Sequence, residues 1–275
     1  MDFNTLVFLG FFAGVAVLTY CVPRAAKPYL WLLASYAFYL YKPENARLVF
    51  ILISVTVVTW VCALAMDSVP QQATRRLFLV VSLAVCCGFL FFFKYFNFFG
   101  ENLTELFQLF GVEADWVTID ILLPVGISFY TFQALSYTID VYQHKIKPTH
   151  DIVAFFAFIS FFPQLVAGPI ERATNLLPQF LVPRGFSYDK AVDGMRQILW
   201  GLFKKMVVAD NCAAAVNLIF DEYQTLGGTH LFLGALFFTF QIYGDFSGYS
   251  DIAIGTARLF GVNLMRNFNF PYFSR

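Results

Sequence analysis

Long apolar runs separated by short polar segments dominate the chain. A helix needs roughly 20 apolar residues to cross the hydrocarbon core of a bilayer. Runs of about this length, some with interruptions, lie at residues 3–22, 48–66, 77–99, 121–142, 152–170 and 231–261, and a shorter run lies at 28–41. The pattern predicts an all-α polytopic membrane protein, in which residues 231–261 form either one tilted helix or two shorter ones.

The basic residues between the runs predict an orientation, because short cytoplasmic loops carry an excess of Lys and Arg. If residues 28–41 span the membrane and the N-terminus lies outside the cytoplasm, six basic residues face the cytoplasm and two face out. They are Arg24, Lys27, Arg75, Arg76, Lys145 and Lys147 against Lys42 and Arg47. Without that crossing, the same residues divide equally, so the spanning arrangement is favoured. It places Glu101, Glu105, Glu113, Asp115 and Asp120 outside.

Residues 190–210 have the pattern of an amphipathic helix. One face is apolar, and the other carries Lys190, Asp193, Arg196, Gln197, Lys204 and Lys205. Such a helix lies in the membrane interface or lines an aqueous cavity. We therefore divide a single membrane domain into N-terminal spans at 1–170, an interfacial and amphipathic region at 171–229, and a polar intramembrane segment at 230–275.

Composition narrows the class of protein. Hydrophobic residues make up 59% of the chain and charged residues 13%, against about 45–50% and 25% in soluble domains. These values exclude a disordered chain and, with a net charge of zero, a nucleic-acid binder. The five cysteines follow neither a zinc pattern nor a disulfide pattern. The three histidines, His144, His150 and His230, lie outside the spans and are assigned surface or capping roles.

Three segments place helix breakers or charges at membrane depth: residues 123–130, 161–172 and 241–251. Proline removes a backbone donor, and freed backbone groups are tolerated there only next to protein or water. Gly244 and Gly248 permit close approach of another helix. These features predict a polar cavity, with a purely structural polar cluster as the alternative. The candidate cavity residues are Gln164, Arg172, Gln241, Tyr243, Asp245, Ser247 and Asp251.

The same three segments resemble signatures of the membrane-bound O-acyltransferase family. The first begins Leu-Pro-Val-Gly-Ile-Ser-Phe-Tyr at residue 123, and the second reads Phe-Phe-Pro-Gln-Leu-Val-Ala-Gly-Pro-Ile from residue 161. The third runs from Tyr-Gly-Asp-Phe-Ser-Gly-Tyr-Ser-Asp at 243 to Asn-Phe-Pro-Tyr at 269–272. The resemblance covers nearly the whole chain and is strongest to the bacterial branch that O-acetylates exopolysaccharides such as alginate. Teichoic acid D-alanyl transfer proteins are more distant.

The resemblance implies a ring of transmembrane helices around a tunnel in the bacterial inner membrane. A thioester such as acetyl-CoA or an acyl-carrier thioester donates an acyl group, which we expect to be acetyl, from the cytoplasm. The acceptor is a hydroxyl of an extracytoplasmic polysaccharide, reached through an acetyl-transfer partner protein. Membrane lipid is expected around the chain, and no nucleic acid, metal or tightly bound cofactor is expected.

The resemblance assigns no catalytic residue within this chain. In this branch a Trp-His-x-Ser motif follows the Asn-Phe-Pro-Tyr segment, and a second family histidine comes later, both beyond Arg275. The chain is therefore expected to be an N-terminal portion that is inactive by itself. Two other hypotheses stay open from the residues alone. One is a transporter or channel, although no internal repeat is visible, and the other is an inactive truncated remnant that serves as a membrane scaffold.

Overall fold

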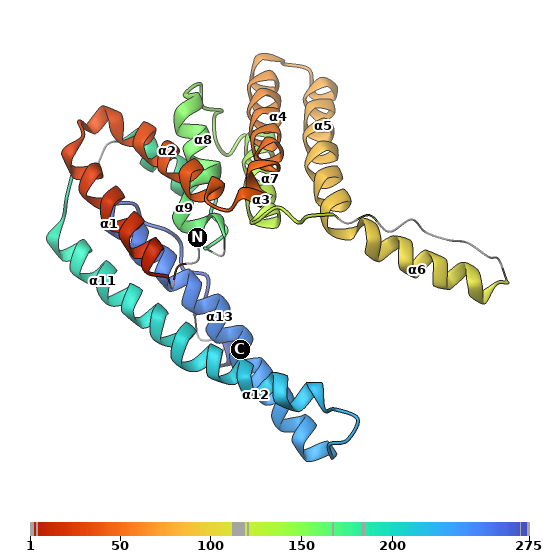
Figure 1. Cartoon of the computed structure of the whole chain (residues 1–275). Coiled ribbons are helices and arrows are strands. Elements are labelled where there is room, and N and C mark those ends of the chain that lie inside the picture. Colours follow the sequence, from red (N-terminus) through yellow and green to blue (C-terminus); the bar gives the residue numbers. More distant parts are fainter. Residues whose placement is uncertain are drawn as a thin grey trace.

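The computed structural model describes residues 3, 5–111, 119, 121–166, 168–182, 185–269 and 271–273. Every regular element in these ranges is a helix, as the sequence predicts (Figure 1). Part of the predicted outer loop (Glu113, Asp115 and Asp120), as well as Ala167 and Phe270 of the family-like segments and Arg275, lie outside the described residues.

The first group of helices surrounds an aromatic core. It contains α1 (Leu6–Cys21), α2 (Lys27–Leu40), α8 (Ile152–Ser160) and α9 (Phe162–Leu165), with η1 (Arg24–Ala26) and α3 (Pro43–Ala46) as short connections. The Phe162 ring lies 6.5 Å from the ring of Phe8, 5.7 Å from that of Phe38 and 5.8 Å from that of Phe260. Residues from four distant parts of the chain therefore share one core.

The second group packs α4 (Val49–Ser68) against α5 (Gln72–Leu90) and α7 (Ile127–Tyr142). The buried guanidinium of Arg75 joins two helix ends, because it donates to the carbonyl oxygens of Met66 at 3.0 Å and Val141 at 3.3 Å. The helix of α5 continues through η2 (Phe91–Tyr95) into α6 (Phe96–Leu109), which projects away from the bundle (Figure 1).

Two helical stretches in the described ranges are long and apolar enough to cross a membrane: Val49–Ser68 and Gln72–Leu109. They match two of the predicted runs. Residues 6–21 form a shorter apolar helix. Within the predicted run at 152–170, α8 ends at Ser160, the helix breaks at Phe161, and α9 follows at Phe162–Leu165 with a proline in its first turn. The complete set of spans and their orientation therefore stay predictions.

The end of α9 packs against the turn that starts α7. Gly126 has φ of +73°, and a Cβ there would lie 2.3 Å from the carbonyl oxygen of Leu165. Only glycine fits this left-handed and crowded position. Two segments that the sequence marks as helix breakers are thus in direct contact, and they shape one junction between α7 and α9.

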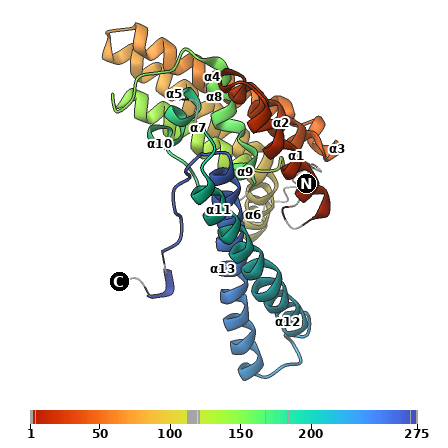
Figure 2. The ribbon, with the colours of Figure 1, turned by 90° about the vertical axis from the view of Figure 1, so that its left-hand side faces the viewer.

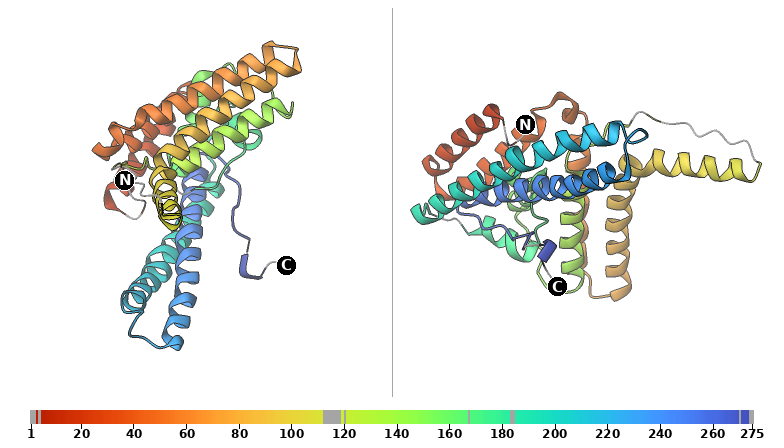
Figure 3. Two further views of the ribbon diagram at one scale, coloured as in Figure 1. Left: turned by 90° about the vertical axis from the view of Figure 1, so that its right-hand side faces the viewer. Right: turned by 90° about the horizontal axis from the view of Figure 1, so that it is seen from below.

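The third group is a long antiparallel helix pair. One arm is α11 (Tyr188–Leu202), η3 (Phe203–Ala209) and α12 (Asp210–Asp221), and the other is the continuous α13 (Gly228–Leu259) (Figures 2 and 3). The predicted run at 231–261 therefore forms one helix, which ends at Leu259, and not two. The preceding α10 (Ala173–Leu181) lies beside α8.

Glycines set the spacing of this pair. A Cβ on Gly201 would lie 2.6 Å from the carbonyl oxygen of Gly248, and a Cβ on Gly255 would lie 2.5 Å from that of Gly194. The two backbones are in contact, which confirms the close approach predicted at Gly248. Small residues allow such contact between helices in membranes.

The outer faces of the pair are largely apolar, and the lysine and the carboxylate nearest its seam point inward. Leu199 and Phe232 are each 70% exposed, whereas Lys204 and Asp251 are largely covered. The helix predicted at 190–210 is therefore present. Gln197, Lys204 and Lys205 of its polar face contact α13, whereas Asp193 and Arg196 are exposed. This distribution is the one expected of helices surrounded by lipid, where ionisable groups face the protein interior.

We expect Gly201→Ala to destabilise the protein by about 1–3 kcal/mol, because the added methyl group overpacks the contact with α13. The measurement is the midpoint of thermal unfolding in detergent. Gly88→Ala, in α5, is the matched control, because a Cβ there has no heavy atom within 4 Å. Equal midpoints for both variants would contradict the assigned glycine contact.

Candidate functional site

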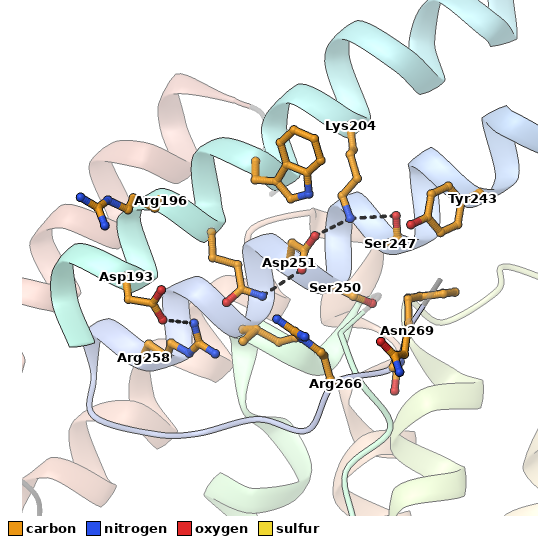
Figure 4. A pocket seen from close by; sticks show the side chains of 15 residues that line it. Asp193, Arg196, Lys204, Tyr243, Ser247, Ser250, Asp251, Arg258, Arg266 and Asn269 are labelled. Atoms are coloured by element: carbon orange, nitrogen blue, oxygen red, sulfur yellow. Dashed lines mark hydrogen bonds and ion pairs between the residues drawn. The ribbon is translucent and has the colours of Figure 1, made fainter. Parts of the chain in front are cut away.

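A polar cavity of about 350 Å³ lies between α11, α13 and the extended segment at residues 262–269 (Figure 4). Three of the seven candidate residues, Tyr243, Ser247 and Asp251, line it from α13. Arg266, Asn267, Phe268 and Asn269 line it from the extended segment. Both ends of the third family-like segment therefore contribute to one cavity, although the lining residues are up to 26 positions apart in the sequence.

Lys204 is the centre of the polar contacts in this cavity. Its ammonium group forms an ion pair with Asp251 and donates a hydrogen bond to Ser247 Oγ at 2.9 Å. The other Asp251 oxygen accepts from Gln197 Nε2 at 2.9 Å (Figure 4). The two charged side chains are only 11% and 18% exposed. The carboxylate that the sequence places in an apolar stretch thus has a charged partner and a hydrogen-bond donor.

Asp245 faces a different partner. It pairs with Lys205, which also forms an ion pair with Asp210 at 2.8 Å. Asp245 does not line the polar cavity. Lys204 and Lys205 are consecutive residues in the π-helical segment η3, and they reach carboxylates six positions apart on α13. The ion pairs of Lys204 and Lys205 therefore join the two arms of the helix pair at two positions along α13.

The other candidates lie elsewhere. Gln164 is buried in α9 and donates to Gln133, whose amide donates to the carbonyl oxygen of Phe158 at 2.7 Å. Arg172 is exposed at the start of α10. Gln241 is half-buried on α13, outside the lining of the cavity. Gln164 thus supports the core, and the structure does not bring these three together with Asp251.

Sequence reasoning missed three residues that hold the cavity wall: Glu171, which lies just before α10, and Asn175 and Gln179 within it. Glu171 is completely buried and accepts hydrogen bonds from the backbone N–H of Met265 and from Asn175 Nδ2. Gln179 exchanges two hydrogen bonds of 2.9 Å with the backbone of Asn263. Their spacing of four places them on one helical face. That spacing was the available signal, and we call these three residues the α10 clamp.

Glu171 lies outside both candidate spans. Burial raises the pKa of its carboxyl group, and the hydrogen bonds from Asn175 and the Met265 backbone oppose that shift. A buried acid with several donors is stable only while those donors stay in place. The clamp therefore ties the position of residues 263–265, and with it the adjoining Arg266, to α10.

Comparisons with known proteins support the family that the sequence motifs resemble. No family model matches the chain. The probable alginate O-acetylase AlgI of Pseudomonas aeruginosa is 39% identical over 278 residues, which is 100% of this chain and 52% of that protein. The peptidoglycan O-acetyltransferase of Helicobacter pylori is 33% identical over 98% of this chain and 56% of its own length. The teichoic acid D-alanyltransferase of Bacillus subtilis is 24% identical over 55% of this chain and 39% of its own length.

The chain thus spans about half the length of the curated relatives it matches. Within that half, the match to the O-acetylases extends over the cavity and the α10 clamp, because it covers at least 98% of the chain.

We expect Lys204→Met to destabilise the protein by about 1–3 kcal/mol, because it leaves Asp251 partly buried without its countercharge. The double variant Lys204→Met/Asp251→Leu should lose less than the sum of the two single variants, because it removes both charges. The free energies of unfolding of the four proteins in detergent give this double-mutant cycle. Lys190→Met, on the same helix, removes a lysine outside the cavity and should have little effect. Strictly additive losses would show that the pair is not coupled.

We expect Glu171→Leu to release the segment after α13, since the hydrogen bonds to Met265 and Asn175 are lost. Hydrogen exchange resolved by peptide should show faster exchange at residues 263–265. Thr174→Ala, an exposed neighbour, is the control and should leave exchange unchanged. Unaltered protection in Glu171→Leu would refute the clamp.

Proposed function

Because the chain belongs to the membrane-bound O-acyltransferase family, we propose that it forms the donor- and acceptor-facing cavity of a membrane enzyme that transfers an acyl group, acetyl in this branch. The donor is a cytoplasmic thioester, such as acetyl-CoA or an acyl-carrier thioester. The acceptor is a hydroxyl of a polysaccharide outside the cytoplasm, reached with an acetyl-transfer partner protein. The chain would lie in a bacterial inner membrane as several spans, with its N-terminus outside.

The observation that supports this proposal most is the polar cavity between helices with apolar outer faces. Asp251, Ser247 and Tyr243 line it from α13, and the residues around Arg266 line it from the segment after that helix. Charged groups and dipoles that are held in place beside the reacting groups stabilise developing charge without having to reorganise. The ion pair of Lys204 with Asp251 and its hydrogen bond to Ser247 would hold such groups in place.

The reaction is a displacement at the thioester carbonyl. The acceptor oxygen forms the new C–O bond, the C–S bond breaks, and the hydroxyl proton passes through a general base to the departing thiolate. Negative charge develops on the carbonyl oxygen during the attack. The cations and hydrogen-bond donors of the cavity would stabilise that charge. We assign no general base to the residues of this chain.

The relatives act on different polymers by name: alginate, peptidoglycan and teichoic acid. Their common feature is a polymer that carries an ester-linked acyl group. The names therefore support the class of reaction and the class of acceptor. Identity to the alginate O-acetylases of up to 39% over the full chain makes an exopolysaccharide the acceptor we propose.

The test uses membranes from cells that express the complete gene that contains this coding sequence, with any codons that follow residue 275, supplied with a radiolabelled acetyl thioester. We expect ester-linked label in an extracytoplasmic polymer and a decrease of at least tenfold in Asp251→Asn. Asp221→Asn, on the exposed end of α12, should retain full transfer. No label above that of a control strain would overturn the proposal, and solute flux without any donor would favour a transporter instead.

A further inference from the structure

A second cavity, of about 460 Å³, lies between α10 and the loop that joins α7 to α8. The loop lines it with residues 146–150, and α10 lines it with Ala173, Leu177, Pro178 and Leu181. The helix packs beside both α8 and α7 (Figure 2). This cavity shares no residue with the polar cavity or with the three family-like segments, so the proposed acyl transfer leaves it unexplained.

α10 turns opposite faces to the two cavities. Asn175 and Gln179 of the α10 clamp donate to the carbonyl oxygen of Asn263, in the segment beside the polar cavity. Every fourth residue from Ala173 to Leu181 lines the second cavity instead. The two sets are offset by two positions, which is about 200° around a helix. A ligand in the second cavity therefore contacts the back of the helix that fixes one wall of the polar cavity.

Hydrogen bonds to neighbouring helices hold the loop wall of the second cavity in place. The carbonyl oxygen of Thr149 accepts from Trp60 Nε1 at 2.9 Å, and the Thr149 N–H donates to the Tyr137 hydroxyl at 3.2 Å. The Asp151 carboxylate accepts from the N–H of Ala154 and so caps α8. The loop is thus ordered before a ligand arrives, and binding loses little conformational entropy there.

Lys147 and His150 form the polar rim of this cavity. Both side chains are exposed, and among the residues that the structure places neither forms an ion pair or a hydrogen bond. Lys145, on the same loop, lies outside the lining and pairs with Asp140 at 3.7 Å. The described residues that line the cavity include no acid. The rim therefore favours an anionic group.

Most of the remaining lining is apolar, and it continues onto the surface of the protein. Leu177 is buried, whereas Leu181 is 47% exposed and is followed by Val182, which is 60% exposed. A cationic rim beside an apolar edge matches an amphiphile with a negatively charged headgroup. A free anion would leave the apolar edge uncovered, and an uncharged lipid would leave Lys147 without a counterion.

We propose that the second cavity binds an acidic phospholipid. The phosphate lies at Lys147 and His150, and the acyl chains leave the cavity over Leu181 and Val182. Phosphate oxygens accept hydrogen bonds from an ammonium group and from an imidazole N–H. In the orientation that we propose, this loop lies on the cytoplasmic side, where anionic lipids are abundant and basic pockets between helices bind their headgroups. The inference goes beyond the proposed acyl transfer, because it concerns another cavity and no reacting group.

The experiment measures lipid binding by native mass spectrometry, with the delipidated protein from the complete gene in detergent. Dihexanoyl phosphatidylglycerol is compared with dihexanoyl phosphatidylcholine, which has the same chains and no net charge, and with glycerol phosphate, which has no chains. We expect phosphatidylglycerol to bind about tenfold more tightly than either of the others. Its binding should slow hydrogen exchange at residues 146–150 and 173–181, which locates the site.

The double variant Lys147→Gln/His150→Gln should remove most of the preference for phosphatidylglycerol over phosphatidylcholine. Arg76→Gln, which changes an exposed arginine on α5 outside the cavity, should leave the preference unchanged. Equal binding of the three probes, as a cavity for a protein segment would give, would overturn the inference. A preference that survives the double variant, or slower exchange confined to other segments, would overturn it as well.

Discussion

The structure depends on the burial of charge between two helices whose outer faces are apolar. Lys204 meets Asp251 and Lys205 meets Asp245 where η3 packs against α13, and glycines bring the two backbones into contact at the same level. Charged groups inside a membrane need a partner or water. The ion pairs meet that requirement, while the contact of Gly201 with Gly248 keeps the helices close enough for the short pairs to form.

The same arrangement creates the cavity. The polar side chains that satisfy Asp251 come from α11 and η3, so the cavity lies along the seam of the helix pair. Its third wall is the segment after α13, which the α10 clamp fixes through Glu171 and Gln179. A site assembled in this way needs correct packing of α10, α11 and α13 together, and each of them comes from a different stretch of sequence.

Much of this could be predicted from the sequence, and the limits have physical causes. The apolar runs predict helices, and the glycine spacing on α13 predicts the contact at Gly248. Periodicity also predicts the polar face of residues 190–210, but it does not tell whether that face meets water or protein. Lys204 and Lys205 reach separate carboxylates from η3, which is a π-helical segment that regular helical spacing does not anticipate. Gln164 donates a hydrogen bond to Gln133 in the core, and a single sequence does not reveal such a pairing.

The most direct test of the central claim compares two single cysteines in a variant without the five native ones. Asn267→Cys lies on the wall of the polar cavity, and Leu199→Cys lies on the apolar outer face, and both positions are exposed in the structure. In native membranes, a charged thiol reagent should label Asn267→Cys and leave Leu199→Cys unlabelled, because we propose that lipid covers only the outer face. Labelling of Leu199→Cys with an unreactive Asn267→Cys would contradict the account.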